Sequence, residues 1–108
     1  MAVVTVYVDD AAIPASVRNG ARTHTSSWSH LTADSTGELI EFVVRIGLKP
    51  AWIQHRGTPL EHFDVTAPKR LAAIRSGAVP ITWREGAAQV IAKRCGVPFD
   101  LGALRARL

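Results

Sequence analysis

The chain has 108 residues, 47% of them apolar, which fits one folded domain with its own core and excludes a disordered polymer. Its single cysteine, Cys95, excludes an internal disulfide, and no apolar run approaches the roughly 18 residues that a membrane span needs. We therefore expect a cytoplasmic protein with no membrane partner. The net charge of +4 suggests an anionic partner, but the basic residues are scattered along the chain. This pattern favours a small anionic ligand over nucleic acid.

The first third of the chain combines a strand pattern with a long polar segment. Val3 to Val8 is rich in β-branched residues and predicts a buried strand that stops at Asp9 and Asp10. Residues 11–33 show no helical period and are rich in Ser, Thr and Arg. Because long structureless segments are uncommon in small domains and often cover a site, we predict a lid-like loop over 11–33, anchored near its end by Trp28.

A capping-box pattern marks the start of the first predicted helix. The side chains of Ser35 and Glu38 each satisfy a free amide of the first helical turn, and Gly47 ends the helix. The spacing i, i+3, i+4, i+7 predicts one buried face, made of Leu39, Phe42, Val43 and Ile46. A short second strand is predicted at 51–54.

Two further helices and a third strand are predicted downstream. The second helix begins at Thr66, and a strand at 79–83 leads through a Thr82–Glu85 capping box into the third. The residues predicted to face inward are Leu71, Ile74 and Ala78 from the second helix, and Ala87, Val90, Ile91 and Cys95 from the third. Asp100 caps a last helix within a helical tail at 99–108.

This alternation of strands and helices predicts a single α/β domain over 1–108. We expect a small three-layer domain with a short, mostly parallel sheet of three or four strands and flanking helices. Ligands bind beyond the carboxyl ends of the strands in open sheets of this kind. The predicted strands end at Asp9–Asp10, at 54–56 and at 82–84. The sequence therefore predicts a polar site at the C-terminal edge of the sheet.

Five stretches of the chain carry a family resemblance. They are Val6-Tyr7-Val8-Asp9-Asp10, Trp28-Ser29-His30-Leu31-Thr32-Ala33-Asp34, Trp52-Ile53-Gln54, His62-Phe63-Asp64-Val65-Thr66 with Lys69-Arg70, and Gly77-Ala78-Val79-Pro80. Together they make the chain similar to a family of small uncharacterised bacterial and actinophage proteins, the domain of unknown function 4031 (DUF4031). The resemblance covers most of the chain and implies that these polar residues belong to a site. It implies no reaction.

His62 and Asp64 form the most informative pair of the polar residues. Residues two apart on an extended segment point the same way, so this imidazole and this carboxylate can face one space. The pair suits a general base with a neighbouring acid, or two metal ligands. The alternative is structural, with His62 bonded to a backbone carbonyl and Asp64 capping the second helix. His30 and Asp10 complete the candidate catalytic set.

Two other groups of residues are candidates for binding. Asp9 and Asp10 could hold a divalent metal, the one cofactor considered, or could simply terminate the strand. A lysine or arginine beside a helix N-terminus is unfavourable, because that end of the helix is itself positive, unless an anion binds between the two. Alternatively, these side chains could project into water. The candidate ligand-binding residues are Arg56, Lys69, Arg70, Arg84, Gln54, His55 and Trp28.

The function predicted from these residues is binding of, or action on, a phosphorylated or nucleotide-like ligand. One alternative is a nucleic-acid-binding protein or a metal-dependent nuclease accessory protein, motivated by the excess of basic residues. The other is a non-enzymatic interaction module in a phage or its host. Whether the protein is an enzyme stays open at this point.

Overall fold

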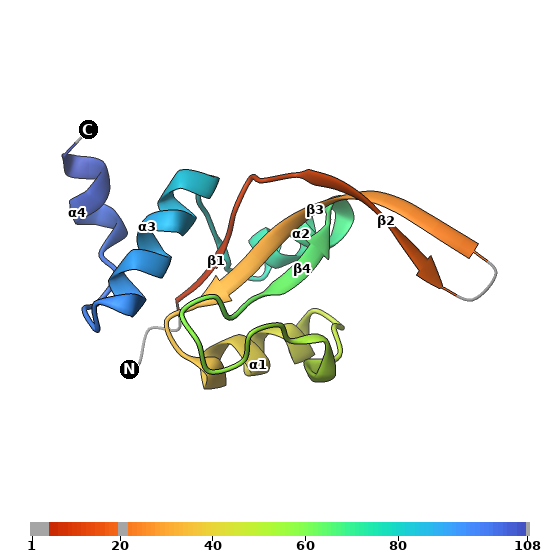
Figure 1. Ribbon diagram of the computed structural model, residues 1–108, viewed down its shortest axis with the longest axis horizontal. Coiled ribbons are helices and arrows are strands. Elements are labelled where there is room, and N and C mark those ends of the chain that lie inside the picture. The colour runs from red at the N-terminus through yellow and green to blue at the C-terminus, as the bar shows by residue number, and fades with distance from the viewer. Residues whose placement is uncertain (1–4, 20–21, 108) are drawn as a thin grey trace.

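The computed structural model describes residues 5–19 and 22–107 (Figure 1). Val3, where the first strand was predicted to begin, lies outside these residues. The strands are β1 (Val6–Val8), β2 (Ile13–Asn19), β3 (Arg22–Ala33), β4 (Phe63–Thr66) and β5 (Val79–Pro80). The helices are α1 (Thr36–Arg45), the 3-10 helix η1 (Pro50–Trp52), α2 (Ala67–Arg75), α3 (Trp83–Arg94) and α4 (Leu101–Ala106). None of the helices within the described residues is long and apolar enough to cross a membrane.

The strands form one mixed five-stranded sheet around β3. β1, β2 and β4 each pair antiparallel with β3, whereas β1 and β5 run parallel. The predicted α/β class is confirmed. The predicted mostly parallel sheet of three or four strands is wrong, because three of the four strand pairs are antiparallel and therefore need no helical crossover between them.

The segment predicted as a lid-like loop over 11–33 instead supplies β2 and β3. These strands form a long hairpin in register from Ile13 opposite Trp28 to Asn19 opposite Arg22. Figure 1 shows the hairpin reaching beyond the helices. Antiparallel pairing satisfies the backbone groups of a segment that has few apolar side chains, which is why its composition resembled that of a loop.

Of the other two predicted strands, the one at 51–54 is wrong and the one at 79–83 is shorter than expected. Residues 50–52 form η1, with Pro50 in its first turn, and Gln54 makes an isolated antiparallel bridge to His62. The strand predicted at 79–83 is limited to Val79 and Pro80. Proline lacks the amide that a ladder needs, so strand pairing around Pro80 stays short.

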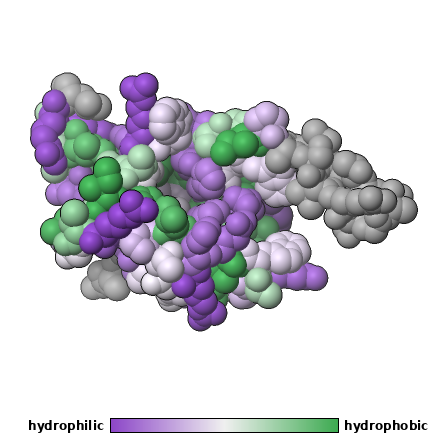
Figure 2. All heavy atoms as spheres, viewed as in Figure 1, coloured by the Kyte–Doolittle hydropathy of each residue, from purple (hydrophilic) through white to green (hydrophobic). Residues whose placement is uncertain are grey.

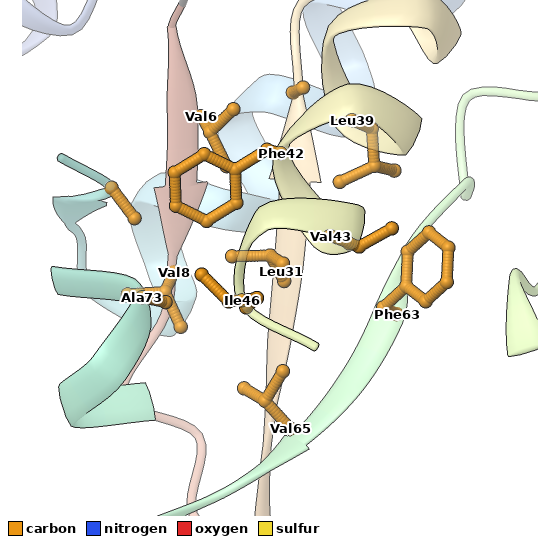
Figure 3. Close-up of a cluster of buried hydrophobic side chains, with 12 residues drawn as sticks. Val6, Val8, Leu31, Leu39, Phe42, Val43, Ile46, Phe63, Val65 and Ala73 are labelled. Carbon is orange, nitrogen blue, oxygen red and sulfur yellow. The ribbon is translucent and has the colours of Figure 1, made fainter. Parts of the chain in front are cut away.

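The two faces of the sheet have different chemistry because side chains alternate along each strand. On one face, apolar residues of β1, β3 and β4 pack against α1 and α2 (Figure 3). The core residues are Val6, Val8, Leu31, Ala33, Leu39, Phe42, Val43, Ile46, Phe63, Val65, Ala73 and Ala78. The intervening residues, among them Tyr7, His30 and Thr32, therefore belong to the second face. There Tyr7 meets the Phe99 ring at 5.3 Å, edge to face.

The apolar face predicted for α1 is confirmed, but its capping box forms only in part, because the Glu38 carboxylate accepts hydrogen bonds from the Thr5 amide and the Ser35 hydroxyl instead of from the Ser35 amide. The hydroxyl oxygen of Ser35 accepts a hydrogen bond from the Glu38 amide, and all four residues of the predicted apolar face are buried.

In α2 the prediction for Leu71 is wrong, since its side chain is 53% exposed. α2 covers the sheet with Ala73, the neighbour of Ile74, and the predicted Ile74 and Ala78 do pack at the core.

The start of α3 is predicted correctly, but its buried face is not. Thr82 and Glu85 form the predicted capping box. Of the residues predicted to face inward, Ala87, Ile91 and Cys95 are exposed and Val90 is half-buried. Glu85, Gln89 and Ala92 are buried instead. α3 packs on the polar face of the sheet, where Thr32 donates a hydrogen bond to the Gln89 side chain, so polar residues occupy its inner side.

The C-terminal helix is held to α3 by one ion pair. Asp100 caps α4 as predicted. From α4, the Arg105 guanidinium contacts the buried Glu85 carboxylate at 2.7 Å and also donates to the Pro80 carbonyl oxygen. The hydrogen bonds from Arg105 and from the Thr82 amide lower the pKa of Glu85 to about 2.

Substitution of a core leucine tests the packing of the apolar face. Leu39→Ala is expected to lower the free energy of unfolding by about 2–5 kcal/mol, because Leu39 is fully buried and its removal leaves a cavity. The same change at exposed Leu71 is expected to cost about 0.5 kcal/mol or less. Urea denaturation measures both values. Equal losses for the two variants would contradict the assignment of Leu71 to the surface.

Removal of the Arg105 charge tests the attachment of α4 through its pH dependence. The pKa of Glu85 lies below its unfolded value of about 4.5, so the pair stabilises the fold above that pH and loses its effect as the pH falls toward about 2. Arg105→Met is therefore expected to be less stable than the wild type at about pH 6, with the difference shrinking as the pH is lowered. Urea denaturation across this range gives the comparison. A difference that does not change with pH would mean that Glu85 does not titrate through this pair.

Candidate functional site

The candidate site begins as a row of three residues across neighbouring strands. Asp9, just after β1, donates its backbone amide to the carbonyl oxygen of His30 in β3 at 3.0 Å. His30 lies opposite Asp64 of β4 in the antiparallel register. His62 precedes Asp64 by two residues and shares its side of the strand. These residues lie on the polar face of the sheet, so the predicted convergence beyond the ends of parallel strands is wrong in its location.

Asp9 fixes the orientation of the His30 ring. One oxygen of the buried Asp9 carboxylate lies 2.7 Å from Nδ1 of His30, and the other accepts hydrogen bonds from the amides of His30, at 2.8 Å, and Ala11, at 3.2 Å. Since an ionised carboxylate only accepts, Nδ1 carries the proton of this bond. Nε2 of His30 is therefore the nitrogen left for a ligand.

The same hydrogen bonds set the protonation of both groups. Burial alone would raise the pKa of Asp9, but the bonds from the His30 ring, the His30 amide and the Ala11 amide outweigh it and lower that pKa. The bond to Asp9 raises the pKa of His30, against a smaller opposing effect of burial. Asp9 is thus held as an anion behind the ring.

His62 is oriented in a similar way by the backbone. Its Nδ1 lies 2.7 Å from the carbonyl oxygen of Leu60, which only accepts, so Nδ1 is the donor. Nε2 of His62 lies 3.3 Å from one oxygen of Asp64. The other oxygen of Asp64 accepts a hydrogen bond from the Gln54 side-chain amide. The structural alternative for His62 is therefore seen, whereas Asp64 bonds to Gln54 and not to the start of α2.

His30, His62 and Asp64 form a group that could hold a metal ion. One ligand atom from each side chain lies within 4.8 Å of the others, and the two imidazole rings meet edge to face at 5.0 Å. Two histidines and one carboxylate are a recurrent ligand set for zinc and for iron. Metal-binding histidines usually donate the second ring nitrogen to a carboxylate or a carbonyl, as His30 and His62 both do.

The two histidines open on a cavity of about 490 Å³. The residues that line it are Asp9, Ala11, Ile13, His30, Thr32, His55, Pro59, Leu60, Glu61, His62, Trp83, Gly86, Ala87 and Val90. Such a volume is typical of sites for small molecules, and so is a mostly apolar wall with a few polar groups.

A third imidazole, that of His55, reaches the cavity from the loop between η1 and β4. Its ring stacks on that of His62 at 5.9 Å, and its backbone has a φ of 53°, a conformation that non-glycine residues rarely adopt. The loop is held by the buried Glu61, whose carboxylate accepts from the Gly57 amide at 2.7 Å and from the Thr36 hydroxyl at 2.6 Å. Strained residues that the surrounding structure holds in place are frequent at functional sites.

The predicted cation sites are not gathered at the cavity. Lys69 donates to the carbonyl oxygen of Ile46 at the end of α1, and Nε of Arg70 donates to the backbone oxygen of Asp9. The Arg84 guanidinium lies over the Trp83 ring at 5.4 Å. Arg56 is exposed beside His55.

The remaining candidate residues have structural partners. Asp10 accepts a hydrogen bond from the Trp83 amide at the start of α3, 2.7 Å away. The Asp9 carboxylate faces His30. The structure thus places neither acid in the group of described residues that could hold a metal ion, whose carboxylate comes from Asp64. Trp28 is half-buried in β3, opposite Ile13 and Thr66.

The hydrogen bonds that hold the site residues in place were not predicted from the sequence. Sequence reasoning assigned no role to Glu61 or Gln89, and it named Asp9 only as one of three acids, with Asp10 and Asp64, that would orient the histidines or hold a metal. Alternation of polar and apolar residues in Trp28-Ser-His-Leu-Thr-Ala33 and in His62-Phe-Asp-Val-Thr66 is the signal that could have placed both segments on one two-faced sheet.

Comparison with known proteins identifies the family. No curated protein and no solved structure matches the chain. A family model, described as a protein of unknown function (DUF4031), matches residues 6–94. The matched region includes the whole row from Asp9 to Asp64. The chain therefore belongs to the DUF4031 family.

Proposed function

We propose that this protein is a metal-dependent hydrolase that acts on a small ligand with an anionic group, such as a phosphate ester. The metal would be bound by Nε2 of His30, Nε2 of His62 and the carboxylate of Asp64. The observation that carries the proposal is the convergence of ligand atoms from these three side chains, and Nε2 is assigned to each ring because both histidines already commit the Nδ1 proton elsewhere.

Electrostatics favours a cation between these groups. With the proton of His62 on Nδ1, Nε2 presents a lone pair to the Asp64 oxygen only 3.3 Å away, and two acceptors at that distance repel each other. A shared cation, either a proton or a metal ion, removes the repulsion. A tetrahedral zinc ion with bonds of about 2.0–2.2 Å would draw the three ligand atoms closer together than 4.8 Å.

The three proposed protein ligands would leave a coordination position of the metal open for water or substrate. Three protein ligands with a further open position are the pattern of catalytic rather than structural zinc sites. A metal bound in this way polarises a phosphoryl oxygen and lowers the pKa of bound water to about 7. The chain itself would supply ring orientation through Asp9 and Leu60. His55, stacked on His62 and lining the cavity, is the residue we assign to proton exchange with the ligand.

Charge supports an anionic ligand. Beyond the metal, Arg56 and Arg84 are exposed and each directly follows a residue that lines the cavity. Arg70 donates Nε to the backbone oxygen of Asp9, and none of these arginines is among the residues that line the cavity. Together with the net charge of +4 they would act at longer range, by attracting an anion toward the protein.

Metal binding tests the proposal first. The wild type is expected to bind one Zn²⁺ or Co²⁺, and His62→Ala is expected to abolish this binding because it removes a ligand. His55→Ala is the matched control, since His55 lies in the same cavity but outside the metal-binding group, and it is expected to retain the metal. Isothermal titration calorimetry gives stoichiometry and affinity. Equal metal binding by wild type and His62→Ala would refute the centre.

Turnover tests the reaction with the same variants. Zn²⁺- and Mn²⁺-loaded protein is assayed on phosphomonoesters, phosphodiesters, nucleotides and a single-stranded oligonucleotide. Turnover is expected for a small ester, and it should be lost in His62→Ala and reduced in His55→Ala. Cleavage of the oligonucleotide alone would favour a nuclease instead. If the metal binds as expected but no ester is hydrolysed, the metal site is supported and the proposed hydrolase activity is refuted.

Asp9 offers a test of the support behind His30. Asp9→Asn keeps an oxygen for the two backbone amides but removes the charge, so zinc affinity is expected to fall about 10- to 100-fold. In metal-free protein the pKa of His30 should fall, because Asp9 is what raises it. A nuclear magnetic resonance titration of the His30 ring measures this second effect. An unchanged pKa would show that Asp9 does not hold the proton on Nδ1.

A further inference from the structure

The cavity has an apolar wall that metal binding does not use. Among the lining residues, Ile13 from β2, Leu60 from the loop before β4, and Trp83 from α3 are large and exposed. Trp83 is the largest, at 56% exposure. Figure 2 shows that hydrophobic residues on the face in view lie in separate groups among hydrophilic ones. These three apolar residues, in contrast, share one cavity with His30 and His62.

Trp83 is held in place although its ring is exposed. Its amide donates to Asp10 at 2.7 Å, which fixes the first residue of α3 beside the end of β1. The Arg84 guanidinium lies 5.4 Å from the centre of its ring. The backbone of Trp83 is therefore fixed, and only the two side-chain torsions of the indole remain to be ordered when a flat group stacks on it.

We propose that the ligand carries an aromatic ring that stacks on Trp83 while its phosphate reaches the metal. This inference rests on the proposed metal centre and names the class of substrate, an aryl or heteroaryl phosphate ester rather than an aliphatic one. Ile13, Leu60, Ala87 and Val90 would cover the rest of the ring. A cavity of about 490 Å³ accommodates a molecule of that size.

The structure supplies a matched control for Trp83. Trp52 is also 56% exposed, and the Lys49 ammonium lies 5.5 Å from its ring, much as Arg84 lies from Trp83. Trp52 does not line the cavity. A change at Trp52 therefore reproduces the loss of an exposed, cation-flanked indole without touching the proposed ligand.

The test compares phenyl phosphate with propyl phosphate, each titrated into zinc-loaded protein by calorimetry. The wild type is expected to bind phenyl phosphate more tightly. Trp83→Ala should weaken phenyl phosphate about 5- to 100-fold, as loss of one stacking partner does, and leave propyl phosphate nearly unchanged. Trp83→Phe should retain most of the affinity, and Trp52→Ala should alter neither ligand.

The outcomes separate this inference from the metal centre. Zinc binding without any preference for the phenyl ester overturns the aromatic subsite and leaves the metal centre standing. An equal effect of Trp83→Ala on both esters, or an equal effect of Trp52→Ala, also overturns it. A wild type that binds no zinc refutes both proposals. Zinc affinity is measured for each variant, so a fold defect in Trp83→Ala is recognised by lost metal binding, and Trp83→Phe then decides.

Discussion

The hydrogen bonds between Asp9 and His30 are the interaction on which the arrangement depends. They join the end of β1 to the middle of β3 through the backbone, and they join the two side chains at 2.7 Å. The buried Asp9 carboxylate is tolerated because it accepts three hydrogen bonds. The same bonds decide which nitrogen of His30 is free. One contact therefore extends the pairing of β1 with β3 and also sets the chemistry of the site.

The two faces of the sheet have different roles: one packs the apolar core, and the other carries the candidate site. Apolar residues of β1, β3 and β4 form the core under α1 and α2, so substitutions of these residues affect folding. Their alternating neighbours on the same strands face α3 and the cavity, where Thr32 bonds Gln89 and where His30 and His62 meet. The packed side makes the polar side rigid, which is what a metal site with fixed ring orientations requires.

What could be predicted from the sequence follows from how local each signal is. The Ser35 N-cap of α1 and the apolar spacing of this helix are contained in a dozen residues, and both were predicted correctly. The contact between His62 and Asp64, at 3.3 Å, could also be predicted, because side chains two residues apart on an extended segment point to the same side. The pairing of β2 with β3 depends on residues far apart, and so does the contact of Asp9 with His30. The spacing of apolar residues could not predict which side of α3 is buried, because this helix packs on polar side chains of the sheet. Its apolar residues Trp83, Ala87 and Val90 line the cavity instead.

The position of a bound metal tests the account most directly. Crystals of the protein soaked with Zn²⁺ can be measured at the zinc absorption edge, where anomalous density locates the ion. One peak is expected about 2.0–2.1 Å from Nε2 of both His30 and His62, and within bonding distance of an Asp64 oxygen. A peak bound through Nδ1 of either ring, a peak elsewhere, or no peak would contradict it.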